Sequence, residues 1–303
     1  MSDLPARGRA GGKVILLGEH AVVYGRPAVA SGIALALDAE AVRGAGPRLE
    51  SEEASDARGA RLVEDACRAV GLDPRAWVVR VRSAIPAGQG LGSSAALCVA
   101  TLRALAVAAG RALARDEELR LGRTLEGIFH GTPSGIDPTA AALGATFRFV
   151  RGDPPSVEPI ALGAPVSLVI ALGGTARSTG AAVGGLRERW QADPSRYEKL
   201  FDDVAAVVED GVRTLRAGDL PALGATFDCN QALLEALGVS SPEIEARVAV
   251  ARAAGALGAK LTGGGAGGAV IALVDGDCAD AVAAALRKGG ATILKMTLAS
   301  ATR

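Results

Sequence analysis

Residues 86–96, with the sequence PAGQGLGSSAA, constrain the fold of this chain more than any other stretch. They follow an apolar segment over 76–83 that predicts a strand, and they precede an Ala- and Leu-rich segment that predicts a helix to about residue 109. The three glycines let the backbone turn tightly, and the two serines stand in the first helical turn, where N–H groups lack helical partners. The loop is therefore either an anion site, usually for polyphosphate, or an ordinary glycine-rich turn capped by serine.

The composition narrows the class of partner. The chain has 303 residues, 49% of them apolar, so it can bury a sizeable core in one large domain or in two of ordinary size. A net charge of zero argues against a nucleic-acid partner. Four cysteines without CxxC spacing indicate reduced thiols, and two histidines argue against a His-based zinc site. Apolar runs are too short to span a membrane, so we expect no membrane association and a cytoplasmic location.

Alternating strand and helix signals organise the rest of the chain. A short strand is expected over 13–17, whereas the polar, charged stretch 43–59 predicts a mobile surface loop. A buried strand over 166–172 begins a second series of strands and helices. We therefore expect an α+β protein with an N-terminal domain over 1–165 and a C-terminal domain over 166–303.

The second informative stretch runs from His130 to Pro138 with the sequence HGTPSGIDP. Pro138 suits the start of a helix, which places Asp137 at or near the N-cap, where amide donors and the helix dipole keep its carboxylate ionised. Asp137 is then either only a helix cap or, beside a lysine, a base or positioning group in phosphoryl transfer.

The third informative stretch, 260–268, has the sequence KLTGGGAGG and matches the pattern G-x-G-x-x-G. A strand over 269–274 follows where the dinucleotide-binding fingerprint requires a helix, so we reject that interpretation. The chain also lacks the Gly-Lys-Ser/Thr of a Walker A motif. The glycines of this loop instead predict a close backbone approach, either to a ligand or to the neighbouring domain.

Together, these stretches resemble the motifs of the GHMP kinases. Residues 13–25 are similar to the first motif in its mevalonate-kinase form, 86–96 to the second, and 260–268 to the third. The pattern HGxPSGxD at 130–137 is typical of the mevalonate-kinase branch. The resemblance spans nearly the whole chain and implies a two-domain GHMP kinase fold, with a ribosomal protein S5 domain 2-like N-terminal domain and a ferredoxin-like C-terminal domain.

The resemblance also implies roles for four side chains. Asp137 matches the catalytic aspartate that takes or positions the proton of the substrate hydroxyl, and Lys13 matches the lysine that pairs with it. Glu126 matches the magnesium-ligating glutamate of the family, and Ser94 matches the serine that shares the metal. ATP and Mg²⁺ are therefore expected at this site.

The remaining expected site residues follow from the same motifs. The ATP phosphates would be bound by the backbone of Gly88, Gln89, Gly90, Leu91, Gly92, Ser93 and Ser94. Mevalonate would be held near Glu19, His20, Thr175 and Arg177. The glycine-rich third motif contributes Thr262, Gly263, Gly264 and Gly265.

The activity that the resemblance implies is ATP-dependent phosphorylation of the primary (C5) hydroxyl of mevalonate to 5-phosphomevalonate, in the mevalonate route to isoprenoids. One alternative is a related kinase for phosphomevalonate or another small alcohol, although a phosphorylated acceptor needs more cations than His20 and Arg177 supply. The other is a non-catalytic, ATP-binding sensor, which would have lost one of the four residues of the catalytic and metal sites. A homodimer is expected from the family.

Overall fold

The structure is a computed structural model that describes residues 6–51, 56–130, 134–173, 179–265 and 268–298. The chain divides into two compact units that interleave along the sequence. Unit 1 comprises Met1–Lys13, Gly32–Ala87 and Leu91–Gly144, and unit 2 comprises Val14–Ser31, Gly88–Gly90 and Ala145–Arg303. The domain boundary expected between residues 165 and 166 stays a prediction.

Four strands supply the sheet of unit 1, and two of them continue into unit 2. They are β1 (Ala6–Leu17), β2 (Ala28–Arg43), β3 (Arg48–Ser51) and β4 (Trp77–Ser83). Strand β2 pairs with β1 and, antiparallel, with β4, which in turn pairs in parallel with β3. Val79 and Val81 of β4 are buried while Arg80 and Arg82 are exposed, so one face of this sheet is apolar and the other charged.

The expectation of a surface loop over 43–59 is wrong in part. Residues 48–51 form strand β3, and β2 continues to Arg43. Leu49 is buried and lies against Gly59, at the start of the following helix. Pairing with β4 therefore orders this segment. Its polar composition predicted a loop because Leu49 is the one large apolar side chain in it.

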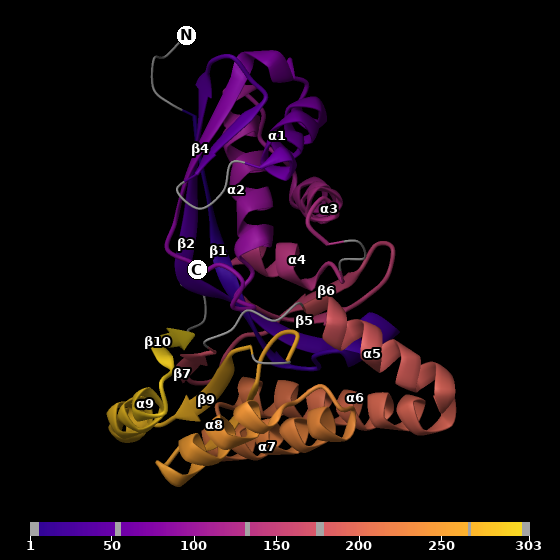
Figure 1. Cartoon of the computed structure of the whole chain (residues 1–303), viewed down its shortest axis with the longest axis vertical. Helices are drawn as coiled ribbons and strands as arrows, with labels where there is room; N and C mark the ends of the chain where they lie inside the picture. The colour runs from indigo at the N-terminus through magenta and orange to yellow at the C-terminus, as the bar shows by residue number, and fades with distance from the viewer. Residues whose placement is uncertain (1–5, 52–55, 131–133, 174–178, 266–267, 299–303) are drawn as a thin grey trace. The chain divides into compact units, whose positions relative to one another are not determined.

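The helices of unit 1 lie on the same side of its strands in Figure 1. They are α1 (Ala57–Val70), α2 (Ser93–Ala108), α3 (Arg115–Glu126) and α4 (Ile136–Leu143), and the short turn η2 (Pro74–Ala76) precedes β4. Helix α2 contacts α1, α3 and α4, and its Ala, Leu, Val and Cys side chains are largely buried. This central place explains why α2 is apolar almost all round, and it fixes the N-terminus that follows the glycine-rich loop.

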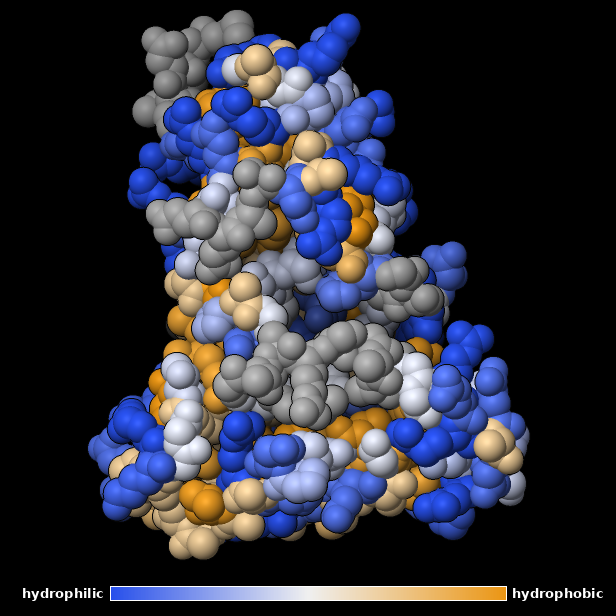
Figure 2. Space-filling view, viewed as in Figure 1, coloured by the Kyte–Doolittle hydropathy of each residue, from blue (hydrophilic) through white to orange (hydrophobic). Residues whose placement is uncertain are grey.

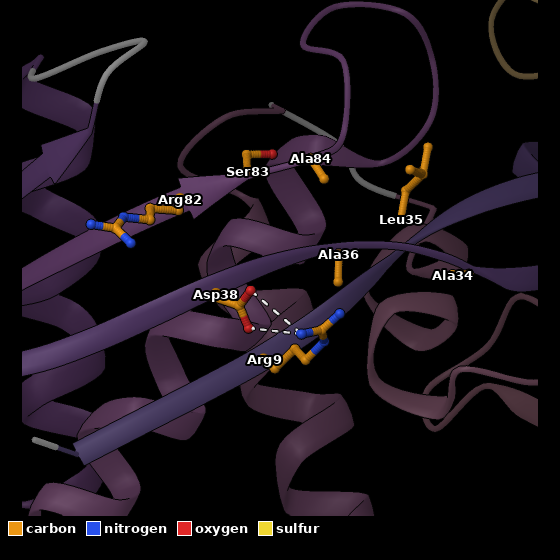
Figure 3. A pocket seen from close by; sticks show the side chains of 8 residues that line it. All are labelled: Arg9, Ala34, Leu35, Ala36, Asp38, Arg82, Ser83 and Ala84. Atoms are coloured by element: carbon orange, nitrogen blue, oxygen red, sulfur yellow. Dashed lines mark hydrogen bonds and ion pairs between the residues drawn. The ribbon is translucent and has the colours of Figure 1, made fainter. Parts of the chain in front are cut away.

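The charged outer face of the unit 1 sheet carries a shallow hollow of about 300 Å³ (Figure 3). Arg9 on β1 bonds to both carboxylate oxygens of Asp38 on β2, at 3.3 and 3.5 Å. Arg82 lies opposite Asp38 on the next strand. Alternating charges of this kind stabilise a solvated sheet face, and none of the expected site residues lines the hollow.

The C-terminal sheet of unit 2 has the strand order β10-β7-β9-β8, with every neighbouring pair antiparallel. Its strands are β7 (Val166–Leu172), β8 (Gly258–Leu261), β9 (Val270–Val274) and β10 (Thr292–Leu298), and β5 (Thr146–Val150) and β6 (Ser156–Pro159) extend the other sheet. With helices between β7 and β8 and between β9 and β10, this is a βαββαβ arrangement. The expected ferredoxin-like domain is confirmed.

Helix starts in unit 2 follow from local sequence. Aspartates cap two helices and a serine caps a third, each just before a proline in the first turn. The helices and short turns are η1 (Ala21–Tyr24), α5 (Thr179–Ala192), α6 (Pro194–Ala217), α7 (Leu220–Ala236), α8 (Pro242–Ala253), η3 (Gly276–Cys278) and α9 (Ala279–Lys288). Helices α7 and α8 contact β8, and α9 contacts β7 and β10.

An aromatic cluster fastens the segment after β1 to the helices of unit 2. The ring of Tyr24 stacks on Phe201 of α6 at 4.2 Å between centroids, and Trp190 of α5 lies 5.3 Å from Tyr24. Beside it, Arg26 forms ion pairs with Glu198 at 2.6 Å and with Asp202 at 2.8 Å. In a chain with only 3% aromatic residues, this concentration anchors the turn that follows Glu19 and His20 to α5 and α6.

Hydrophilic and apolar residues are interspersed over the face of the molecule in Figure 2. Among the helices that the structure describes, none combines the length and the apolar character needed to cross a bilayer.

Candidate active site

The glycine-rich loop has the backbone that an anion site requires. Gly88, Gly90 and Gly92 have φ angles of 69°, 76° and 77°, in the left-handed region that glycine adopts without strain. Helix α2 begins directly afterwards, and Gly92 at its N-cap contributes no side chain to the first-turn N–H groups. Those donors and the positive end of the helix dipole are thus available to a bound phosphate.

Gly92 also makes room for Lys13. A Cβ atom at residue 92 would lie 2.7 Å from Cγ of Lys13, closer than atoms of real side chains approach. The backbone N–H of Lys13 donates to the carbonyl of Leu91 at 2.9 Å, so strand β1 is bonded to the loop at this residue. The glycine thus has two functions, one in the conformation of the loop and one in the packing of the lysine.

Lys13 and Asp137 form an ion pair at the core of the site. Lys13 Nζ lies 3.1 Å from Asp137 Oδ1, and the two side chains are 4% and 27% exposed. Asp137 stands in the first turn of α4, whose N-cap is Gly135. The carboxylate is therefore beside a cation and a helix N-terminus, yet it remains open to an incoming hydroxyl group.

Glu126 completes what we call the Lys13 cluster, which consists of Lys13, Asp137 and Glu126. It is the last residue of α3 and is 2% exposed. The pKa of Glu126 is raised to about 8, chiefly by burial and then by the negative charge of Asp137, against the opposing charge of Lys13. Three charged groups thus interact within one small region of unit 1.

Ser94 connects to this region through His130. Ser94 Oγ lies 3.1 Å from His130 Nε2, and the backbone N–H of His130 donates to the carbonyl of Glu126 at 3.0 Å. The serine hydroxyl is therefore held beside the turn that carries Glu126. Sequence reasoning assigned no role to His130, although it opens the motif that ends at Asp137.

In unit 2, Glu19 is fully buried and bonded to two side chains, and we call Glu19, Lys260 and Asn230 the Glu19 network. Lys260 of β8 forms an ion pair with Glu19 in which both side chains are 0% exposed. Asn230 of α7 donates to Glu19 Oε2 at 3.3 Å and accepts the backbone N–H of Gly18 at 3.2 Å. Burial lowers the pKa of Lys260, and the charge of Glu19 and its hydrogen bond to Lys260 raise it.

His20, the next residue, occupies a strained turn. Its φ and ψ angles are 63° and −50°, and the N–H of Ala21 donates to the carbonyl of Glu19 at 2.7 Å. These values define a γ-turn of positive φ, the rarer of the two forms. The pKa of His20 is lowered to about 4, chiefly by burial and also by the charges of Lys260 and Arg189, while a hydrogen bond to the backbone of Gly264 opposes the change. Within the described part of the chain, nothing hydrogen-bonds to His20 Nε2.

The third glycine-rich stretch packs against backbone within unit 2. Thr262 Oγ1 accepts the N–H of Ile15 at 3.0 Å and donates to the carbonyl of the same residue at 2.9 Å. Gly263 and Gly265 have positive φ, and a Cβ atom at residue 265 would lie 2.1 Å from the carbonyl oxygen of Val239. We expected these glycines to approach either a ligand or the neighbouring domain, whereas the close approach of Gly265 is to Val239 within the same unit.

Comparison with known proteins shows which family this chain belongs to. The family described as GHMP kinases N terminal domain matches residues 58–145, and the GHMP kinases C terminal family matches residues 212–292. A mevalonate kinase from Pyrococcus horikoshii is 33% identical over 300 residues, which cover 87% of each chain. The chain belongs to the GHMP kinase family.

Other GHMP kinases support the same placement. A mevalonate kinase from Aeropyrum pernix is 34% identical over 288 residues, covering 88% of each chain. The crystal structure of L. major mevalonate kinase in complex with R-mevalonate has a TM-score of 0.83 and 30% identity, and the match covers 100% of this chain and 98% of that one. The two-domain fold expected from the motifs is thereby confirmed.

Apart from the two glycine-rich loops already described, the site residues expected for this GHMP kinase fall into three groups. Lys13, Asp137 and Glu126 form the Lys13 cluster, with Ser94 linked to it through His130. Glu19 and His20 lie together in unit 2. Thr175 and Arg177 lie outside the described residues. Sequence reasoning missed the roles of Lys260 and Asn230, although Lys260 opens the third motif.

Glu126 of the Lys13 cluster and Ser94, which is linked to it through His130, fit a magnesium ion. Carboxylate and hydroxyl oxygens from Glu126 and Ser94 are the hard ligands that Mg²⁺ takes, and a buried carboxylate with a raised pKa gains from a nearby cation. Among the described residues, no group of three or more His, Cys, Asp or Glu side chains is arranged to hold a metal. An ion at this site therefore needs further oxygens, which is how Mg²⁺ binds with substrate phosphates.

Proposed function

We propose that this GHMP kinase transfers the γ-phosphoryl group of ATP to the C5 hydroxyl of mevalonate and releases 5-phosphomevalonate and ADP. The observation that carries the proposal is the Lys13–Asp137 ion pair, in which Lys13 is buried and Asp137 is partly exposed, together with the buried carboxylate of Glu126. Phosphoryl transfer needs a positioned hydroxyl and relief of developing negative charge, and this pair offers both. The relatives quoted above are all named mevalonate kinase.

Each residue of the Lys13 cluster has a distinct part in the reaction. Asp137 orients the acceptor hydroxyl and takes its proton as the oxygen bonds to the γ-phosphorus and the bond to ADP breaks. Lys13 forms an ion pair with Asp137 and neutralises negative charge on the transferred group. Glu126 and Ser94 would hold Mg²⁺, which supplies charge neutralisation to the phosphates when bound.

The backbone of Gly88–Ser94 binds the phosphates of ATP in this proposal. Its positive-φ glycines and the N-terminus of α2 favour a polyanion. Mevalonate is held by His20, with Thr175 and Arg177 as further contacts expected from the family resemblance. Both carboxylate oxygens of Glu19 are engaged by protein groups, so its part in substrate binding is indirect.

We also propose that the protein is a cytoplasmic homodimer, as the family resemblance implies. Light scattering after gel filtration measures the mass in solution, and a value near 60.6 kDa, twice the 30.3 kDa of the chain, supports the dimer. A value near that of one chain contradicts it.

The direct test of function is ADP release by the purified protein. Mevalonate, phosphomevalonate, homoserine and galactose are each supplied with ATP and Mg²⁺, and 5-phosphomevalonate is identified by mass spectrometry. We expect turnover with mevalonate and little with the other three. A preference for phosphomevalonate identifies the related kinase instead, and ATP binding without turnover of any alcohol identifies a sensor.

A further inference from the structure

We infer that Lys260 and Asn230 are positioning residues that act through Glu19 to hold His20 in its turn and to direct its imidazole toward the acceptor. The inference rests on the proposed function for its substrate. Its structural part concerns only residues of unit 2. The basis is a set of hydrogen bonds to Gly18 and Glu19, the two residues before His20. Their partners are Asn230 of α7 and Lys260 of β8.

The network holds backbone and side chain together. Asn230 uses its carbonyl oxygen for the N–H of Gly18 and its amide group for the carboxylate of Glu19. Lys260 occupies the other carboxylate oxygen of Glu19 and also donates to the carbonyl of Leu261 at 2.6 Å. Asn230 bonds to both Gly18 and Glu19. The backbone at Gly18 and the side chain of Glu19 therefore cannot change conformation without breaking a buried hydrogen bond.

The γ-turn at His20 needs such support. A non-glycine residue at a positive φ with a negative ψ is strained, and strain of this kind persists only where surrounding structure fixes it. The carbonyl that closes the turn belongs to Glu19, the residue that Lys260 and Asn230 hold. On the far side, the stack of Tyr24 on Phe201 fixes the end of η1.

The strained turn leaves one ring nitrogen of His20 ready for a ligand. His20 is buried, and its Nε2 atom lacks a hydrogen-bond partner among the residues that the structure describes. A buried polar atom without a partner costs free energy unless a ligand completes it. The Glu19 network therefore maintains a strained turn with an unpartnered Nε2 atom at His20. This cost in free energy is offset when the acceptor binds and hydrogen-bonds to that atom.

A merely structural role is the competing explanation. Buried ion pairs stabilise folds weakly, and apolar residues of similar volume often replace them at no cost. The double variant Glu19→Gln with Lys260→Met removes both charges while retaining much of their volume, so no charge remains buried without a partner. It separates the loss of positioning from the loss of folding.

The test measures steady-state kinetics and the spectrum of the histidine rings in that double variant. We expect the KM for mevalonate to rise at least tenfold, with the KM for ATP unchanged within twofold and kcat largely retained. The chain has two histidines, so ¹H–¹⁵N correlations of the imidazoles resolve both, and a His130→Asn variant assigns them. We expect the His20 signals to move and those of His130 to stay.

The matched control is Arg148→Met with Glu209→Gln, which removes another ion pair of unit 2, joined at 2.5 Å. It should leave both the KM for mevalonate and the His20 signals unchanged. Should the double variant fail to fold, Asn230→Ala decides, since it breaks the bonds to Gly18 and Glu19 and leaves the ion pair intact. Unchanged His20 signals and an unchanged KM in a folded variant overturn the inference.

The two proposals fail in distinguishable ways. If wild-type protein releases no ADP with mevalonate, the proposed function fails, whereas the imidazole spectra still report whether Lys260 and Asn230 hold His20. If wild-type protein is active and the variants keep their KM and their spectra, only the positioning role fails.

Discussion

The Lys13 cluster and the Glu19 network begin only a few residues apart in the chain, yet their electrostatic settings differ sharply. Lys13 pairs with an aspartate that is 27% exposed, and among the described residues Lys13 is also the one cation whose charge acts on the pKa of Glu126. Lys260 and Glu19 are both 0% exposed, and the other carboxylate oxygen of Glu19 is bonded to Asn230. One group of charges is open to a reactant, and the other is closed.

The difference indicates two uses for an ion pair within one enzyme. A partly exposed carboxylate beside a lysine can exchange a proton and respond to charge that develops on a substrate. A buried, fully bonded pair is too costly to rearrange, so it suits the fixing of geometry. We therefore expect changes to the Lys13 cluster to affect kcat and changes to the Glu19 network to affect folding and binding of the acceptor.

The largest expected effect is that of Asp137→Asn. It keeps the shape of the side chain but removes the group that orients and accepts the hydroxyl proton, so kcat should fall by roughly 10²- to 10⁴-fold. The Kd for a non-hydrolysable ATP analogue, measured by calorimetry, should change little.

Asp280→Asn is its matched control, because Asp280 also stands in the first turn of a helix and pairs with a lysine, Lys295, at 2.6 Å. The Asp280–Lys295 pair is exposed to solvent, so removing it should leave kcat at the wild-type value. Wild-type turnover by Asp137→Asn contradicts a catalytic role.

Next in size is the loss of stability in Lys260→Met alone. This change leaves the carboxylate of Glu19 buried without its cation, which costs about 3–5 kcal/mol in the free energy of unfolding. Adding Glu19→Gln should recover a large part of that loss. Urea unfolding of both variants checks this, and a single variant as stable as wild type shows that water or another cation reaches Glu19.

His20 should make stability depend on acid. Its pKa is about 4 in the folded protein and near 6.5 when unfolded, so the unfolded state takes up a proton first as the pH falls. The free energy of unfolding should therefore decrease between pH 6.5 and pH 4, by up to about 3 kcal/mol.

The variant His20→Asn tests that origin, because asparagine tolerates positive φ and does not titrate. Urea unfolding at pH 7.5, 6 and 5 should give a shallower pH dependence than wild type shows. His130→Asn, which removes the exposed histidine, is the control. An equal pH dependence in His20→Asn and wild type assigns the effect to other groups.

The smallest of these effects is expected for Glu126→Gln. A neutral amide is a weaker ligand for Mg²⁺, so the concentration of Mg²⁺ for half-maximal activity should rise by about tenfold or more. Glu117→Gln on the same helix, α3, should not change it. Identical Mg²⁺ titrations for Glu126→Gln and wild type remove this carboxylate from the metal site.

Much of the Lys13 cluster could be anticipated because its signals are local. The glycines of 86–96 require positive φ, and the structure has a strand before them and α2 directly after. Pro138 indicates a helix that begins near Asp137; the helix in fact begins at Ile136 with Gly135 as its N-cap, so Asp137 lies in its first turn. The pairing of Lys13 with Asp137 needed the family resemblance, since no local rule joins β1 to α4.

The Glu19 network could not be anticipated in this way. Lys260 and Asn230 are separated from Glu19 by 241 and 211 residues, and their polar side chains stand on elements that otherwise resemble ordinary core strands and helices. The positive φ of His20 contradicts the usual preference of a non-glycine residue, so no propensity predicts it. Strand β3 was missed for the related reason that pairing with β4, rather than composition, orders it.

The most direct test sets the two groups side by side in one kinetic experiment with mevalonate and ATP. Asp137→Asn and the double variant Glu19→Gln with Lys260→Met are assayed together with wild type. We predict that the first loses kcat at an unchanged mevalonate KM, and that the second raises the mevalonate KM at least tenfold while retaining kcat. If both variants lose kcat alone, or both change only KM, the division between a reacting pair and a positioning pair is contradicted.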